Sequence, residues 1–91
     1  MMYNVEYSTK YKKQYRKMVK RGLNMALLDE VVDMLVSGQT LPSKYRDHYL
    51  KGDWKGFKEC HVAPDWLLIY KIENDTLLLT LQQTGTHSDL F

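Results

Sequence analysis

Residues 66–84 read WLLIYKIENDTLLLTLQQT, and this stretch decides the fold. Residues 66–73 form a nearly continuous apolar run, which is typical of a central strand covered on both faces. Asn74-Asp75 suits a two-residue hairpin turn. In residues 76–84 leucines alternate with polar residues, which predicts a second strand with one buried face. The stretch therefore predicts a β-hairpin inside a larger sheet.

Upstream of this hairpin, the pattern predicts a third strand and a turn. Residues 53–62 mix aromatic, basic and apolar side chains and favour a strand. Residues 63–65, Ala-Pro-Asp, form a tight turn, because proline presets its own φ and aspartate bonds neighbouring amides. Residues 39–51 read as a loop. His48 would then lie just before the third strand.

The N-terminal third predicts one strand and two helices. Residues 2–7 alternate apolar and polar side chains, as a short strand does. Ser8 or Thr9 can cap a first helix, in which residues 9–21 carry apolar side chains at helical spacing and Gly22 suits the end. A second amphipathic helix begins after Asn24 and ends at Gly38. Because only a couple of residues join the helices, we expect an antiparallel hairpin.

The predicted order is therefore β-α-α-β-β-β, an α+β fold in which a helical hairpin packs on one face of a small, mostly antiparallel sheet. At 91 residues the chain supports one core, so residues 1–91 are expected to form a single domain. The other face of the sheet would be open, with His48, His61, Asp65 and His87 at strand ends or turns around it.

Composition indicates a globular protein of a reducing compartment. Apolar residues make up 44% and charged residues 26%, which argues against disorder. The single cysteine excludes an internal disulfide framework. We find neither a signal-peptide core at the N-terminus nor an apolar run of about 18 residues. We therefore expect a soluble, cytoplasmic protein without a membrane partner.

The formal net charge of +2 is unevenly distributed. Residues 1–21 carry seven basic side chains against Glu6 alone, whereas the remaining residues carry six basic and ten acidic side chains. A basic block of this kind favours an anionic partner, either nucleic acid or an acidic protein segment. A solvated helix face is the alternative that the charge pattern leaves open.

Several chemistries are disfavoured by the spacing of the polar residues. No two histidines stand at the i, i+4 spacing of a helical metal site, and one cysteine cannot build a zinc ribbon. Cys60 and His61 are adjacent on a predicted strand and would point to opposite faces. The glycines match no phosphate-binding loop. We therefore expect no metal and no cofactor.

Metal-free cleavage of RNA is the chemistry that remains. The 2′-hydroxyl beside the scissile phosphate is the nucleophile, so the protein must supply a base, an acid and positive charge. Histidines and an aspartate suit the proton transfers, although each histidine taken alone is compatible with an ordinary surface or core position. Basic side chains would hold phosphates and aromatic ones would stack on bases. These candidates are Arg46, Lys51, Lys55, Lys58, Trp66 and Phe91, with Trp54 expected in the core.

Two motif blocks carry a resemblance that spans the whole chain. DHYLKGDWKGFKECHVAPDWLLIYKI at residues 47–72 and TGTHSDLF at residues 84–91 closely resemble the YafQ branch of the RelE/ParE toxin superfamily. The resemblance implies the toxin of a type II toxin-antitoxin pair, an endoribonuclease that cuts mRNA in the ribosomal A site. It also implies a DinJ-like antitoxin with a ribbon-helix-helix half, which neutralises the toxin and binds operator DNA with it.

The resemblance also assigns roles to residues. It implies that the acid-base set is His48, His61, Asp65 and His87, and that Phe91 positions the substrate. Trp66 falls inside the motif. Close relatives often carry an arginine where this chain has Gln83. Its neutral amide can hydrogen-bond a phosphate, so Gln83 is a candidate substrate ligand, but it cannot offset developing negative charge as a guanidinium does.

Two other functions are weighed against the nuclease. A module that only binds antitoxin and DNA, or that blocks the ribosome without cutting, is the main alternative because of Gln83. Gyrase inhibition, a third activity within the superfamily, would leave the histidines without a role. In either toxin reading, the lysine-rich helix face with Lys13, Arg16 and Lys20 is the expected contact for an acidic antitoxin segment.

Overall fold

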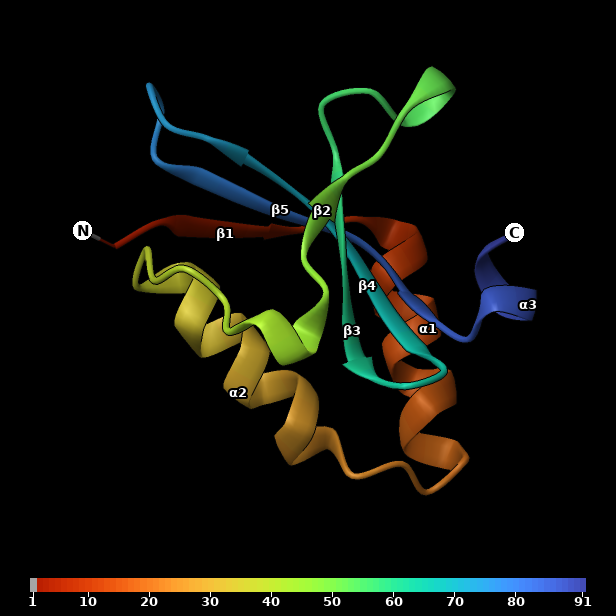
Figure 1. The fold of residues 1–91 in the computed structure, drawn as a ribbon. Coiled ribbons are helices and arrows are strands. Elements are labelled where there is room, and N and C mark those ends of the chain that lie inside the picture. The colour runs from red at the N-terminus through yellow and green to blue at the C-terminus, as the bar shows by residue number, and fades with distance from the viewer. Residues whose placement is uncertain (1) are drawn as a thin grey trace.

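A computed structural model describes residues 2–91 as a five-stranded mixed sheet with two long helices (Figure 1). It confirms the predicted α+β class and the order β-α-α-β-β-β, and it adds a short strand and a C-terminal helix. The elements are β1 (Asn4–Tyr7), α1 (Thr9–Lys20), α2 (Met25–Val36), a 3₁₀ turn (Ser43–Tyr45), β2 (His48–Tyr49), a second 3₁₀ turn (Gly52–Trp54), β3 (Lys58–Ala63), β4 (Trp66–Glu73), β5 (Leu78–Gly85) and α3 (His87–Leu90).

The strands lie in the order β1-β5-β4-β3-β2. β1 is parallel to β5, and every other pair is antiparallel. β4 is the middle strand, and Leu67, Leu68 and Ile69 are fully buried although consecutive residues point to opposite faces. The prediction of a central strand covered on both faces is confirmed.

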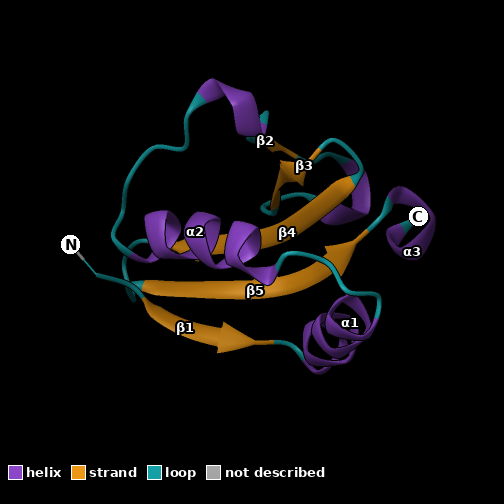
Figure 2. Ribbon diagram, turned by 90° about the horizontal axis from the view of Figure 1, so that it is seen from below, coloured by secondary structure: helices purple, strands orange, loops and turns teal. Residues whose placement is uncertain are grey.

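The helix ends follow the predicted capping residues. Ser8 accepts a hydrogen bond from the backbone N–H of Tyr11 at 2.9 Å, and Asn24 accepts one from that of Ala26 at 3.2 Å. Gly22, at φ +78°, lies in the connection. Figures 1 and 2 show that α1 and α2 diverge from this connection instead of lying side by side along their lengths. The expected close antiparallel hairpin is therefore a splayed helix pair.

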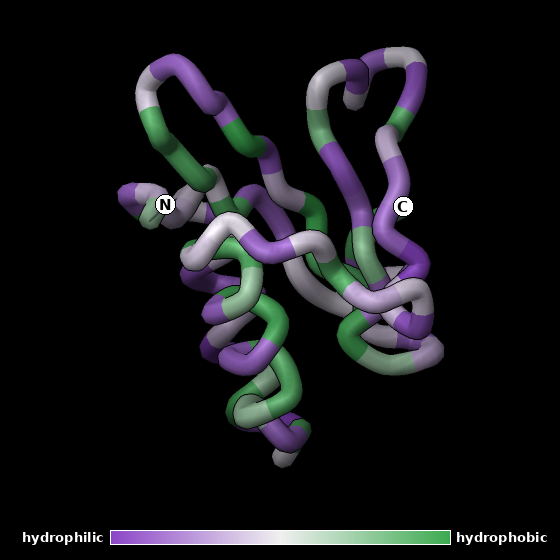
Figure 3. Tube along the Cα trace, turned by 60° about the vertical axis from the view of Figure 1, so that its left-hand side comes forward, coloured by the Kyte–Doolittle hydropathy of each residue, from purple (hydrophilic) through white to green (hydrophobic). Residues whose placement is uncertain are grey.

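The main core lies between α2 and one face of the sheet. Figure 3 shows hydrophobic and hydrophilic residues alternating along α2. Its buried residues, Leu28, Val31 and Leu35, pack in one cluster with alternate residues of the strands. The strand residues of this cluster are Cys60, Val62, Trp66, Leu68, Tyr70, Leu79 and Leu81.

α1 covers the part of β5 that β1 does not reach. β1 pairs only with residues 78–81 of β5, which leaves the following backbone groups without a strand partner on that side. The Ser8 hydroxyl donates to the carbonyl of Gln82, and Gln14 Oε1 accepts from the N–H of Thr84 at 2.9 Å. The side chains of Ser8 and Gln14 thus satisfy backbone groups of β5 that a neighbouring strand would otherwise bond.

The connection between β4 and β5 is longer than predicted. It spans residues 74–77, so β5 begins at Leu78 and not at residue 76. Leu77 has a φ of +51° and is 37% exposed, whereas the alternation placed it on a buried face. The backbone has to reverse before pairing resumes, and Leu77 is part of that reversal.

The strand predicted over residues 53–62 is also shorter than expected, because residues 52–54 form a 3₁₀ turn and pairing with β4 begins at Lys58. His48, by contrast, lies within a strand and not before one, since β2 pairs with β3.

Across residues 2–91, we find no helix that combines the length and apolar character needed to span a membrane.

Candidate active site

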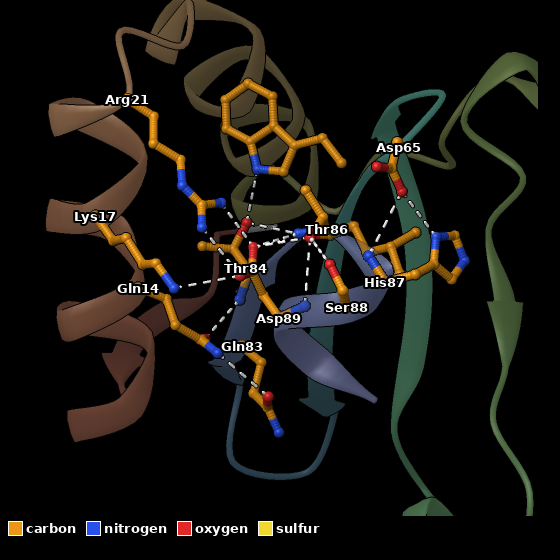
Figure 4. Close-up of polar contacts among 12 residues, drawn as sticks. Gln14, Lys17, Arg21, Asp65, Gln83, Thr84, Thr86, His87, Ser88 and Asp89 are labelled. Atoms are coloured by element: carbon orange, nitrogen blue, oxygen red, sulfur yellow. Dashed lines mark hydrogen bonds and ion pairs between the residues drawn. The ribbon is translucent and has the colours of Figure 1, made fainter.

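His87 and Asp65 form a hydrogen-bonded pair at the end of the sheet (Figure 4). His87 Nδ1 lies 3.0 Å from Asp65 Oδ1, and the backbone N–H of His87 points at the same oxygen from 3.5 Å. The side-chain bond from His87, followed by the backbone one, lowers the pKa of the Asp65 carboxyl. Both side chains are more than half exposed. The pair is therefore ionisable and open to a substrate.

Local chain geometry brings these two residues together. Pro64 and Asp65 form the turn between β3 and β4, as predicted. Thr86 caps α3, which makes His87 the first residue of that helix. The predicted C-terminal tail is thus a helix, and its start is fixed against the Asp65 turn.

His61 adds a second imidazole beside this pair. It lies on β3, three residues before Pro64 begins the turn, and its ring centroid is 6.1 Å from that of His87. Its Nδ1 lies 3.4 Å from the carbonyl oxygen of Pro64. Two imidazoles this close, one of them paired with a carboxylate, can serve as an acid and a base on one small group. Of the predicted acid-base set, His61, Asp65 and His87 are brought together.

His48 faces the same side of the sheet from the edge strand. It stands opposite Glu59 in the β2–β3 pairing, and His61 follows Glu59 by two positions, so the three side chains share one face. His48 Nδ1 lies 2.7 Å from the carbonyl oxygen of Arg46, and Nε2 lies 3.5 Å from Glu59 Oε1. The face lined by the histidines is the one opposite the α2 core.

Glu59 is a candidate functional residue that the sequence reasoning missed. Its side chain is only 9% exposed, yet its one ionic neighbour among residues 2–91 is the half-exposed His48. A nearly buried carboxylate needs a partner, so the contact with Glu59 holds the His48 imidazole on this face of the sheet. The signal available in the sequence was the i, i+2 spacing of Glu59 and His61 on one predicted strand.

A groove of about 340 Å³ runs beside His61. Lys44 and Arg46 line it together with the apolar side chain of Val62, and so do Leu27 and the acidic Glu30, so the groove lies between α2 and the end of β3. Two cations against one carboxylate in a groove of this size suit a nucleotide and its phosphate. Arg46 was predicted as a phosphate ligand, whereas Lys44 was not.

The other predicted phosphate ligands lie elsewhere. Lys51 and Lys55 are exposed in the loop before β3, and Asp65 follows the end of β3, a six-residue strand. Such a strand spans about 20 Å, so these lysines are remote from the histidine pair. Lys58 Nζ lies 2.7 Å from Asp47 Oδ2, which already neutralises its charge.

The aromatic candidates separate into core and surface. Trp66 is 5% exposed and donates its indole N–H to Thr84 Oγ1 at 2.9 Å, so it packs in the core and presents no face to a base. Trp54 packs edge-on against Phe57, with the ring centroids 5.4 Å apart, but it is only half-buried and lies outside the core cluster, so its predicted core position is wrong. Phe91 is 65% exposed beyond α3. Among the proposed stacking residues, Phe91 is the one that is mostly exposed to solvent.

Gln83 is buried where the resemblance would place a charged side chain. It is 2% exposed, and its Oε1 accepts from Gln14 Nε2 at 3.4 Å. Its pairing partner on β4 is the fully buried Ile69. Gln83 is therefore buried and does not reach a phosphate, contrary to its predicted role as a substrate ligand.

Cys60 faces the core and not the face that carries the histidines. Cys60 is fully buried in the α2 core, and burial raises the pKa of its thiol to about 12. Residues 2–91 contain no group of three or more His, Cys, Asp or Glu placed to hold a metal ion.

Comparisons with known proteins identify relatives that match nearly the full chain. The family model for the bacterial toxin YafQ of type II toxin-antitoxin systems matches residues 3–91. The mRNA interferase toxin YafQ of Escherichia coli strain K12 is 42% identical over 89 residues, covering 97% of this chain and 95% of that protein.

Solved structures agree. A chain of the E. coli DinJ-YafQ toxin-antitoxin complex has a TM-score of 0.91 at 40% identity and covers 100% of this chain and 99% of its own. A metal-bound toxin from Helicobacter pylori has a TM-score of 0.91 at 44% identity, with both chains fully covered. These matches define a class, the toxin half of a type II toxin-antitoxin pair. Within that class, the chain belongs to the YafQ family of bacterial toxins.

Proposed function

We propose that this toxin is an endoribonuclease that cuts mRNA in the A site of the 70S ribosome, without a metal ion. The observation that carries the proposal is the exposed His87–Asp65 pair with the His61 ring 6.1 Å away. The name of the E. coli relative, an mRNA interferase, supports the same reaction class. The toxin would act in the cytoplasm, where the ribosomes are.

The reaction needs two proton transfers and no redox step. A base removes the proton of the 2′-hydroxyl, the 2′-oxygen attacks phosphorus, and the 5′-oxygen leaves with a proton from an acid. The products are a 2′,3′-cyclic phosphate and a 5′-hydroxyl. The imidazoles of His61 and His87 suit the two transfers, and Asp65 orients the His87 ring through its contact with Nδ1. His48, held by Glu59, belongs to the same face and completes the set.

Substrate contacts follow from the surroundings of the histidines. Lys44 and Arg46 line the groove beside His61, where positive charge offsets that of the phosphate. Phe91 offers an exposed ring next to α3 for a base unstacked from the message. Lys51 and Lys55, about 20 Å away by strand length, suit the phosphates of ribosomal RNA better than those of the cleaved codon.

An antitoxin is the proposed protein partner. A groove of about 370 Å³ opens between α1 and α2, lined by a row of rings from Tyr7, Tyr11 and Tyr15 and by the cations Lys12 and Arg16. Aromatic walls with a basic rim suit an amphipathic segment that carries acidic residues. The DinJ-YafQ complex supports such a partner, which would also bring the toxin to operator DNA.

Charge reversal on α1 tests this contact. Lys13→Glu, Arg16→Glu and Lys20→Glu together reverse the predicted face, and Lys12→Glu with Arg16→Glu reverses the two cations that line the groove. Both variants should weaken antitoxin binding and make the remaining affinity less dependent on salt. Lys10→Glu, on the first turn of the same helix, is the matched control. Unchanged affinity in both variants would place the antitoxin elsewhere.

The alternative function, binding antitoxin or ribosome without cleavage, is favoured by one observation. Gln83 is neutral and buried, so no cation stands at the position where relatives often carry arginine. Arrest of translation without new mRNA ends would support this alternative.

Cleavage of a defined mRNA tests the proposal. Purified toxin is mixed with the message alone or with the message on ribosomes, each with and without a chelator selective for transition metals, so that the ribosome keeps its Mg²⁺. We expect codon-positioned cuts only on ribosomes, because a protein of net charge +2 binds free RNA weakly. The chelator should change nothing. Equal cutting of free RNA, or loss of cutting with chelator, would contradict the proposal.

A further inference from the structure

Asp89 ties the helix that carries His87 to α1 (Figure 4). Arg21 binds its carboxylate with both terminal nitrogens, Nη1 to Oδ2 at 2.9 Å and Nη2 to Oδ1 at 3.2 Å. Lys17 Nζ lies 3.3 Å from Oδ1. The Asp89 side chain is only 11% exposed, and a two-pronged guanidinium contact fixes orientation as well as distance. The contact joins residues 68 positions apart in the sequence.

The same carboxylate also caps α3. Oδ2 of Asp89 accepts from the backbone N–H of Thr86 at 2.9 Å, and the Thr86 hydroxyl accepts from the N–H of Asp89 at 3.3 Å. This reciprocal pair is a capping box. A helix of four residues cannot form alone, so His87 keeps its place only while these contacts hold.

Gly85 leaves room for this arrangement. A Cβ atom at position 85 would meet the Cβ of Asp89 at 2.9 Å and its Oδ2 at 3.0 Å. The backbone of Gly85 also has a φ of +154°, which side chains rarely adopt. The glycine of the TGTH motif therefore allows Asp89 to lie against the end of β5.

We propose that Asp89, clamped by Arg21 and Lys17, is a positioning residue that sets the location of His87 beside Asp65 and His61. The role of His87 in cleavage rests on the proposed function, whereas the clamp itself is independent of it. Asp89 touches neither substrate nor the reacting atoms. It acts through α3, because one carboxylate both fixes the first turn of that helix and anchors it to α1.

The basic side chains in and just after α1 fall into two groups. Lys17 and Arg21 are held by Asp89, whereas Lys13 and Arg16 make no ion pair within residues 2–91. Lys13 and Arg16 therefore remain available to an acidic antitoxin segment, whereas Lys17 and Arg21 support the active site.

Two readouts test the clamp, one with substrate and one without. The variants are the double replacement Lys17→Met with Arg21→Met, Asp89→Ala, and Asp89→Glu, which keeps the charge and the capping box. Lys10→Met is the control on the same helix. Cleavage of ribosome-bound mRNA is followed in single turnovers at varied toxin concentration, and the pKa of Asp65 is measured by NMR of its carboxyl carbon.

The double variant and Asp89→Ala should cleave about 10-fold to 100-fold more slowly at saturation, as small misplacements of a catalytic group do, with the half-saturating concentration little changed. The pKa of Asp65 should rise towards its ordinary value as the bond from His87 is lost. Asp89→Glu and Lys10→Met should behave like the wild type.

An unchanged Asp65 pKa in the folded double variant would overturn the clamp, whatever happens to cleavage. A raised Asp65 pKa with an unchanged cleavage rate would contradict the positioning role. If the wild type itself does not cleave, the proposed function fails, and the Asp65 pKa still decides whether the clamp holds α3.

Discussion

Glu59 Oε1 lies 3.5 Å from His48 Nε2 across the β2–β3 pair, and the carboxylate is nearly buried while the imidazole is half exposed. A carboxylate accepts a stronger hydrogen bond than an amide does, so Glu59 holds the imidazole more firmly than a glutamine would. Glu59→Gln keeps the shape and removes the charge, so we predict that ribosome-dependent cleavage falls about 10-fold to 100-fold, within the range of one acid-base group. Glu73→Gln, an exposed carboxylate at the far end of β4, is the control.

Coupling between the two residues gives a sharper form of the same prediction. If Glu59 acts through His48, the double variant Glu59→Gln with His48→Ala cleaves no more slowly than His48→Ala alone. Additive losses would show that Glu59 has a separate role.

Asp65 should matter for the rate of cleavage, because it orients His87. Replacing it by asparagine removes the carboxylate oxygen that lies 3.0 Å from His87 Nδ1. We predict that Asp65→Asn lowers the rate about 10-fold to 100-fold. An unchanged rate would contradict the pairing as a functional contact.

Gln14 should matter for stability. Its amide accepts from the N–H of Thr84 and donates to Gln83, and both partners are buried. Gln14→Leu leaves those groups without a partner, which lowers the free energy of unfolding by about 1–3 kcal/mol. Urea denaturation measures the loss, and Lys10→Leu on the same helix should stay within about 0.5 kcal/mol of the wild type.

Acid should weaken the Asp89 clamp. The guanidinium of Arg21, then the capping contacts with Thr86, hold the pKa of this carboxyl well below its ordinary value. A carboxyl with a lowered folded-state pKa stabilises the fold above its unfolded pKa of about 4, and the stabilisation is lost as pH falls through the folded-state value. The difference in unfolding free energy between the wild type and Asp89→Asn should therefore be constant near neutral pH and shrink below about pH 4. A difference that does not vary with pH would contradict the ion pair.

Much of the scaffold was predictable from local sequence patterns. The apolar run at residues 66–73 gave a central strand, and Ser8 and Asn24 marked the starts of both long helices. β2 was missed because two residues carry no periodicity, and only pairing with β3 defines it. The helix α3 had a signal, since Thr86 and Asp89 show the spacing of a capping box.

The site was less predictable, because burial decides which polar and aromatic residues remain available. His61, Asp65 and His87 meet because a turn and a helix start coincide in space, and all three lie in the two motif blocks. Trp66 and Gln83 lie in the same motifs but are buried, whereas Lys44 and Glu59 lie outside the expected set and line the site. Which face a strand side chain points to depends on the pairing register. The β4–β5 register shifts between Ile69, which pairs with Gln83, and Tyr70, which pairs with Leu81, so simple alternation along β5 does not predict the direction of Gln83.

The most direct test of the account is the chemistry of the mRNA ends produced on ribosomes by the wild type and by His87→Ala. Attack by the 2′-hydroxyl predicts codon-positioned cuts with 5′-hydroxyl and 2′,3′-cyclic phosphate ends, and these should fall at least about 100-fold in the variant. Cuts that bear 5′-phosphates, or cuts that persist unchanged without His87, would contradict the account.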